Sequence, residues 1–300
     1  MASGSVIIAG ACGYGVWPAN TVEAAVRCLQ TPVDGIEVDV HLSRDGHVVA
    51  CHDYRVDADV ARDASGRWID PPGPLIRSLT LDEIRRFDVG RLRPGSAELE
   101  RHPASQSIDG ARIPTLRDLI GVLAAAADRA REIYVEIKTN PQDAEVSSNP
   151  VALTGAVMAL LTEMNQVDRT TIIAFDWSVL RWLSNRYPGI RTAHLSIPRQ
   201  LEGAIKLNER GDSPWADGFD AHRYGGSQPR AIAAHGGKAW SVYFRDITPE
   251  ALREARDLGL SVAVWGVVER SDIDAMLAMG IDSVTVSGPD WGQARDAVSC

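Results

Sequence analysis

The stretch GIEVDVHLSRDGHVVACHD, residues 35–53, places acidic and imidazole side chains on a segment that otherwise reads as a buried strand. Glu37 and Asp39 alternate there with aliphatic residues, so their carboxylates share one face of the strand, about 6.6 Å apart. A third acid, Glu136, ends another candidate strand, YVEIK, and Lys138 follows on the same face. A single acid at a strand end more often forms an ion pair, but carboxylates from two strands suit Mg²⁺, Mn²⁺ or Ca²⁺. The set therefore predicts a metal site beside which Lys138 can hold an anionic oxygen.

His52 is the histidine in this stretch best suited to move a proton. It follows a short apolar run, residues 47–51, that is expected to pair back on the preceding strand as a hairpin. The ordinary pKa of an imidazole suits general acid or base catalysis at neutral pH. Adjacent side chains of an extended chain point apart, which argues against Asp53 as the orienting partner of His52.

Short runs rich in Val and Ile alternate with amphipathic segments along the chain. The runs expected to be strands are 5–10, 35–40, 133–138, 171–175, 191–196, 218–223, 261–265 and 282–286, with 239–244 as an auxiliary strand. The segments expected to be helices are 21–29, 115–130, 150–165, 177–186, 249–258 and 271–279, the fifth capped by Thr248. About eight strand–helix repeats predict an α/β fold, the TIM (β/α)₈ barrel, whose strand ends line the active-site mouth. A doubly wound sheet is the alternative, but GACGYG after the first strand does not match its glycine-rich phosphate turn.

Residues 54–112 interrupt this alternation. The segment is rich in Pro and Gly and contains one clear helical pattern, SLTLDEIRRF at 78–87. Connections of this length are uncommon and are usually functional. We interpret the segment as an insertion after the second strand, near the barrel mouth, within a single domain spanning residues 1–300.

Composition excludes several classes of partner. The chain has 300 residues, 45% of them hydrophobic, and a net charge of −9, which argues against binding to nucleic acid or anionic lipid. No apolar stretch reaches the roughly 18 residues of a membrane span. The apolar N-terminus lacks a preceding basic residue and is expected to be the first barrel strand, not a secretory signal. Four cysteines without CxxC spacing are expected to be free thiols, which favours a cytoplasmic location.

The 35–53 stretch resembles the E-x-D…HD block of the glycerophosphodiester phosphodiesterase family. Further similar motifs follow in the family's order: VEIKTNP, AFDW and VAVWGVV…GIDSVTVSGPD. The resemblance implies a TIM barrel that acts on a small-molecule phosphate ester with one divalent ion, Mg²⁺ being the leading candidate. It implies that His52 is one of two catalytic histidines and that Lys138 lies near the phosphate. The ligands that it implies for the metal are Glu37, Asp39 and Glu136, and the residues that it implies for the substrate pocket are Phe175 and Trp265.

The first loop departs from the family pattern. The family has H-R-G after the first strand and then P-E-N-T, whereas this chain reads AGACGYGVWPANT, with Ala19 in place of the Glu and no imidazole near residues 10–12. This difference leaves three hypotheses open. The first is a metal-dependent phosphodiesterase with a remodelled acid/base site. The second is a metal-dependent lyase or cyclase acting on a phosphate or diphosphate ester, in which a hydroxyl tethered in the substrate replaces a positioned water. The third is a non-catalytic barrel that binds a phosphorylated ligand, against which the retained carboxylates argue.

Overall fold

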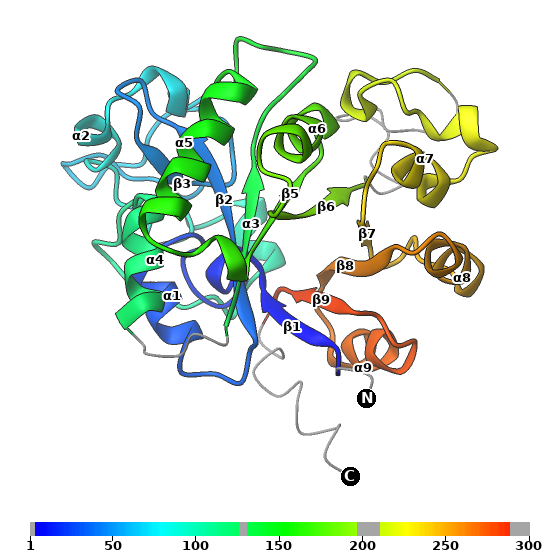
Figure 1. The fold of residues 1–300 in the computed structure, drawn as a ribbon. Helices are drawn as coiled ribbons and strands as arrows, with labels where there is room; N and C mark the ends of the chain where they lie inside the picture. Colours follow the sequence, from blue (N-terminus) through cyan, green and yellow to red (C-terminus); the bar gives the residue numbers. More distant parts are fainter. Residues whose placement is uncertain (1–3, 126–130, 197–210, 289–300) are drawn as a thin grey trace.

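Eight parallel strands close into a barrel in the computed structural model, which describes residues 4–125, 131–196 and 211–288 (Figure 1). Each strand pairs with the next around the ring, and the pairing of β1 with both β9 and β2 closes it. The strands are β1 (Val6–Ala9), β2 (Gly35–Leu42), β4 (Glu132–Ile137), β5 (Thr170–Ala174), β6 (Arg191–Leu195), β7 (Ala239–Tyr243), β8 (Ser261–Val267) and β9 (Ser283–Val286). The prediction of a TIM barrel is confirmed.

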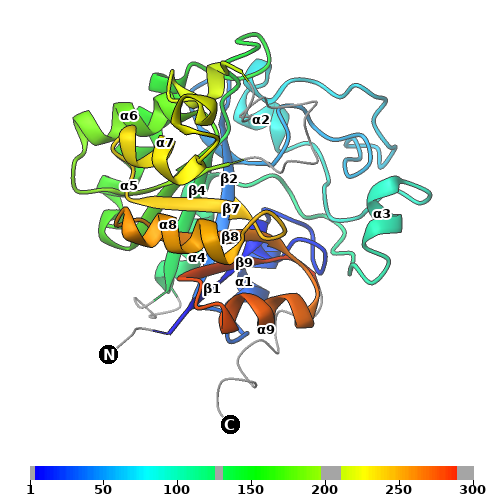
Figure 2. The same cartoon turned by 90° about the vertical axis from the view of Figure 1, so that its right-hand side faces the viewer.

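Helices surround this barrel (Figures 1 and 2). The outer helices are α1 (Val22–Cys28), α4 (Leu116–Ala125), α5 (Pro150–Glu163), α6 (Trp177–Arg186), α7 (Gln228–Ala234), α8 (Pro249–Asp257) and α9 (Arg270–Ala278). The six expected helical segments agree with α1, α4, α5, α6, α8 and α9, and the last residues of 115–130 lie outside the described part. Thr248 caps α8 as expected, since its side chain accepts a hydrogen bond from the Ala251 N–H.

Two strand predictions are wrong. Residues 218–223 do not form a barrel strand: Ala221–Tyr224 is a 3₁₀ helix, and the buried Asp220 carboxylate accepts a hydrogen bond from the Ser213 N–H. The segment 239–244, expected to be auxiliary, contains barrel strand β7, in which buried Trp240 and Val242 alternate with Ser241. The serine faces the barrel interior, where a polar side chain is tolerated, and this breaks the apolar run that marks the other strands.

A hairpin and the long segment 54–112 follow β2. Strand β3 (Val48–Ala50) pairs antiparallel with β2, which confirms the hairpin expected at 47–51. The expected helix at 78–87 is shorter in the structure, a 3₁₀ turn (Ile76–Ser78) followed by α2 (Leu81–Ile84). This segment also holds α3 (Ala97–Arg101), which Figure 2 shows at the edge of the molecule. It contributes most of a second buried cluster, with Ile76 and Ile84 fully buried. We still interpret the segment 54–112 as an insertion within one domain, because its buried cluster includes Val49 of β3.

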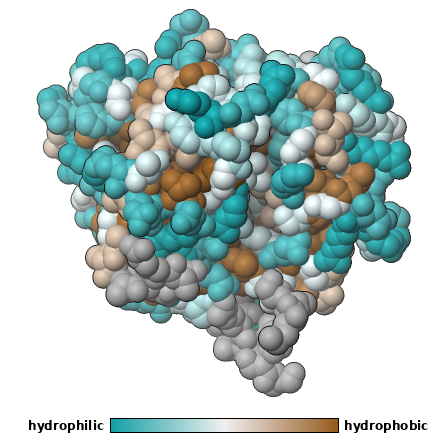
Figure 3. All heavy atoms as spheres, viewed as in Figure 1, coloured by the Kyte–Doolittle hydropathy of each residue, from teal (hydrophilic) through white to brown (hydrophobic). Residues whose placement is uncertain are grey.

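The surface seen in Figure 3 is mostly hydrophilic, with hydrophobic residues in separate patches. Large hydrophobic side chains are exposed at single positions such as Val26 and Val151. Among the described helices, none combines the length and the apolar character that crossing a bilayer requires.

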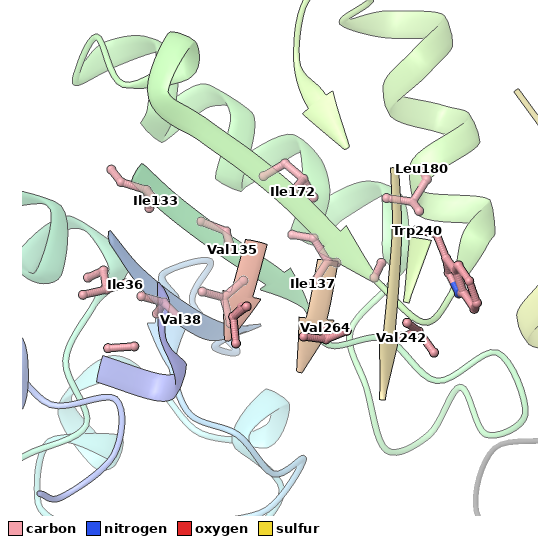
Figure 4. Close-up of a cluster of buried hydrophobic side chains, with 14 of the residues drawn as sticks. Ile36, Val38, Ile133, Val135, Ile137, Ile172, Leu180, Trp240, Val242 and Val264 are labelled. Atoms are coloured by element: carbon pink, nitrogen blue, oxygen red, sulfur yellow. The ribbon is translucent and has the colours of Figure 1, made fainter. Parts of the chain in front are cut away.

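The main core lies between the strands and the helices (Figure 4). Ile36 and Val38 of β2 and Ile133 and Val135 of β4 are fully buried in this layer. Because successive side chains of a strand face opposite ways, the residues between them must point into the barrel. The apolar alternation of these two strands therefore fixes the direction of the acidic side chains.

Candidate metal centre and active site

Three buried carboxylates meet at the mouth of the barrel. Glu37 and Asp39 lie on β2 and Glu136 on β4, where Asp39 is the register partner of Glu136. One oxygen from each carboxylate lies within 4.8 Å of the other two, and all three residues are buried. The structure thus brings together the three residues expected to hold a metal, here called the acidic cluster.

Lys138 is the cation that contacts this cluster. Its Nζ lies 2.9 Å from Asp39 Oδ1 and 2.7 Å from Glu136 Oε1. Burial lowers the pKa of Lys138, but the two carboxylates outweigh it and hold the pKa well above its ordinary value. One ammonium against three carboxylates leaves two negative charges when all are ionised, the charge that one divalent cation balances.

Glu37 is the member of the cluster with an unsatisfied oxygen. Its Oε2 accepts a hydrogen bond of 2.8 Å from the Ala11 N–H, whereas its Oε1 is buried without a hydrogen-bond partner among the described residues. Burial, then repulsion from Asp39 and Glu136, raises the pKa of Glu37 well above its ordinary value. A bound cation would give Glu37 Oε1 a partner and would offset the repulsion among the carboxylates, so the donor set fits a hard divalent ion.

Asn20 fixes the orientation of Asp39. Its Nδ2 donates to Asp39 Oδ2 at 2.8 Å, and its Oδ1 accepts from the Asp39 N–H at 3.2 Å. Burial raises the pKa of Asp39, but Lys138, His52 and the hydrogen bonds from Lys138 and Asn20 outweigh it and lower the pKa to about 2. Asn20 itself is buried with a left-handed φ of 55°. Sequence reasoning missed this role, although the P-x-N-T motif was the available signal.

His52 stands after β3, near the acidic cluster and with a largely exposed side chain. Its Nδ1 lies 2.7 Å from Asp53 Oδ1, so the expectation that Asp53 would point away is wrong. The backbone bends after β3, and the alternation of an extended strand no longer holds there. The Lys138 ammonium and partial desolvation inside the cavity lower the pKa of His52, but Asp39 and Asp53 outweigh them, and the net pKa is raised.

A cavity of about 750 Å³ joins these groups. Phe175, after β5, and Trp265, on β8, form one wall with their rings edge to face at 5.8 Å. The residues predicted for the site all line this cavity: Glu37, Asp39, His52, Glu136, Lys138, Phe175 and Trp265.

The first loop brings no imidazole to the cavity. A side chain at Gly10 would meet the Ser287 Oγ at 3.2 Å, and Ala11 is buried beside Glu37. The other imidazole in the cavity wall is His102, just after α3, which packs edge to face against Tyr14 at 4.5 Å between ring centroids. Sequence reasoning missed His102, because no motif surrounds it and only the path of the long segment carries it there.

The model of the glycerophosphoryl diester phosphodiesterase family matches residues 13–290. A glycerophosphodiester phosphodiesterase of Caldanaerobacter subterraneus subsp. tengcongensis is 24% identical over 91% of this chain and 90% of that protein. A crystal structure from Silicibacter pomeroyi DSS-3, assigned as a glycerophosphoryl diester phosphodiesterase, is 29% identical with a TM-score of 0.84, covering 98% of this chain and 93% of the other.

An Oleispira antarctica phosphodiesterase, solved with its product sn-glycerol-3-phosphate, has the same fold. Its TM-score is 0.69 at 16% identity, covering 98% of this chain and 97% of the other. The match of the family model across nearly the whole chain shows that this protein belongs to the glycerophosphoryl diester phosphodiesterase family.

Proposed function

We propose that this protein is a divalent-metal-dependent phosphodiesterase that hydrolyses a glycerophosphodiester. The observation that carries the proposal is the buried acidic cluster, with Lys138 against it, in the cavity of a chain of this family. The name of the Caldanaerobacter relative and the product bound to the Oleispira enzyme support a glycerol-phosphate substrate.

In this proposal Glu37, Asp39 and Glu136 hold the ion, Mg²⁺ being the leading candidate. When bound, the ion neutralises phosphate charge and stabilises charge that develops on the reacting oxygens. Lys138 donates a hydrogen bond to a phosphate oxygen from its place beside the cluster. Phe175 and Trp265 pack against the substrate and exclude water from that side.

His52 is the proposed acid/base group, oriented by the hydrogen bond between its Nδ1 and Asp53. In hydrolysis a water oxygen forms a bond to phosphorus, and the bond from phosphorus to the departing alcohol oxygen breaks. The water loses a proton and the alcohol gains one, and His52 carries one of these transfers. General acid or base groups of this kind contribute about 10²- to 10⁴-fold in rate.

Cyclisation is the second candidate, because Gly10, Ala11 and Cys12 offer no imidazole beside Glu37. Attack on phosphorus by the substrate's own glycerol hydroxyl needs no positioned water, since effective molarity replaces it. The alcohol still departs with a proton, and the product is a cyclic phosphate.

Phosphorus NMR of glycerophosphocholine incubated with the protein and Mg²⁺, Mn²⁺ or Ca²⁺ tests both candidates. A monoester signal supports hydrolysis, an initial cyclic phosphate signal supports cyclisation, and no turnover, of glycerophosphocholine or of lysophospholipids and diphosphate esters tried in its place, favours the binding barrel. Glu136→Gln should abolish turnover. Glu132→Gln is the matched control, because it lies at the other end of β4, where it pairs with Arg191 outside the cavity.

A further inference from the structure

The cavity extends well beyond the acidic cluster, toward the segment 54–112. Val60 and Leu92 of that segment line it together with Tyr14 of the first loop. All three side chains are partly exposed, and we call them the outer wall. The cavity of about 750 Å³ is within the range that holds drug-sized ligands and exceeds what a phosphate with two small alcohols fills.

Leu92 marks the outer wall as a binding surface. Val60 packs on the second buried cluster, whereas Leu92 belongs to none of the hydrophobic clusters of the described residues. Buried Val56 and Val89 also line this cavity and add to its apolar surface. A partly exposed leucine that supports no core and faces a cavity is suited to contact an apolar ligand.

Most of the charged groups near the outer wall have partners. The Asp57 carboxylate, which also lines the cavity, accepts a hydrogen bond of 2.9 Å from the Asp59 N–H. Arg91 contacts Asp109 at 2.6 Å, and the Glu98 carboxylate contacts Arg101 and accepts a hydrogen bond from the Tyr14 hydroxyl. Burial lowers the pKa of His102, which keeps that imidazole neutral at neutral pH. These contacts occupy most of the charged groups, and Val60 and Leu92 are the apolar surface that the outer wall offers to a ligand.

We propose that the outer wall binds an acyl or alkyl chain, so that the preferred substrate is a glycerophosphodiester carrying a single apolar chain. This inference rests on the proposed function, which places the phosphate at the acidic cluster. The chain then lies along Val60 and Leu92, in the part of the cavity that extends beyond the acidic cluster. A chainless glycerophosphodiester would leave this apolar surface in water.

A series of monoacyl glycerophosphocholines with short chains, each kept below its micelle concentration, tests the proposal against glycerophosphocholine itself. We expect kcat/KM to rise by up to about fourfold for each methylene until the wall is covered, the factor that corresponds to ~0.8 kcal/mol per buried CH₂. Equal or better turnover of glycerophosphocholine would overturn the inference and leave the proposed function intact. No turnover of any member would overturn both.

Leu92→Gln tests the wall itself, because it keeps the size of the side chain and removes its apolar character. We expect about a tenfold loss of kcat/KM for the longer chains and a much smaller loss for glycerophosphocholine. Leu258→Gln, at a leucine 41% exposed outside the cavity, is the matched control and should change neither. An equal loss on all substrates, or no loss on any, would overturn the role of Leu92.

Discussion

At the scale of single residues, the hydrogen bonds of Asn20 have a measurable consequence. Loss of a residue that orients a metal ligand typically weakens metal binding about 10- to 100-fold. Asn20→Ala should therefore raise the Kd for Mg²⁺ or Mn²⁺ by at least about tenfold in titration calorimetry. Asn165→Ala is the control, because Asn165 also has a positive φ, 56°, but is exposed and outside the cavity. An equal effect of both changes would mean that backbone strain, not the contact with Asp39, is responsible.

The raised pKa of Glu37 predicts a dependence of stability on pH in the protein without metal. A carboxyl whose pKa is higher in the folded state than in the unfolded state costs stability as pH rises above its ordinary value near 4.5. Glu37→Gln should thus raise the Tm of the chelator-treated protein at pH 8, because the amide avoids the cost of burying the ionised carboxylate. The difference in Tm between variant and wild type should shrink toward pH 4.5, where the Glu37 carboxyl of the wild type is protonated and therefore neutral, like the amide.

Asp39→Asn is the contrasting variant, because the pKa of Asp39 is lowered to about 2. Its ionised form contributes stability that is present above the ordinary carboxyl value and is lost as pH falls toward 2. This variant should lower the Tm at pH 8 under the same conditions. A fall in Tm for both variants would contradict the assignment of opposite pKa shifts.

Residue patterns revealed the acidic cluster because strand alternation has a fixed period. Glu37 and Asp39 could be assigned to one face from their spacing, and Glu136 was added from its place at the end of another strand. The structure brings the three together. Asn20 and His102 could not be found in the same way, because each reaches the cavity from a loop whose path depends on distant contacts. Residues in loops follow no repeating sequence pattern, so the positions of these two side chains are seen only in the structure.

At the scale of elements, the bulge in β8 positions Trp265. The strand shifts register between Val264 and Val267, and Gly266 adopts a φ of 78° there. A Cβ at Gly266 would lie 2.8 Å from the ring of Tyr243, which also packs against the ring of Trp265 at 5.2 Å between centroids. The bulge therefore needs a glycine for two independent reasons, backbone conformation and space.

Gly266→Ala should lower the free energy of unfolding by about 2 kcal/mol or more, from the left-handed φ and the steric clash together. It should also raise KM for a glycerophosphodiester, because Trp265 shifts. Gly259→Ala measures the cost of the left-handed φ alone, about 1 kcal/mol, since Gly259 has a φ of 75° with open space around it. Denaturant unfolding and steady-state kinetics measure the two effects, and equal destabilisation by both changes would argue against the clash.

Element types were predictable wherever an apolar period was long and uninterrupted. Strands β2 and β4 and helices α5 and α8 agree closely with the expected segments. Residues 218–223 were expected to be a barrel strand and the β7 segment an auxiliary one, and both errors have a local cause. Ser241 interrupts the apolar pattern of the observed strand β7. Phe219 and Ala221 alternate with polar residues as in a strand, but their segment ends in a 3₁₀ turn.

At the scale of the whole molecule, metal binding should stabilise the folded state. A ligand that binds only the folded protein adds about 2.7 kcal/mol at a concentration 100 times its Kd. Thermal unfolding with MgCl₂ or MnCl₂ should show a rise in Tm that saturates with concentration. Glu136→Gln should reduce the rise strongly, whereas Glu132→Gln should keep it. An equal rise in wild type and Glu136→Gln would indicate a general salt effect.

The contacts of Lys138 bear on how the protein would tolerate removal of the proposed ion. The ammonium bridges Asp39 and Glu136 directly, so two of the ligands stay gathered by an internal counter-charge. Removal of a bound metal by a chelator and its later replacement should therefore form a reversible cycle. Protein stored without metal should keep its fold and regain full function when the metal is added back, with no refolding step between.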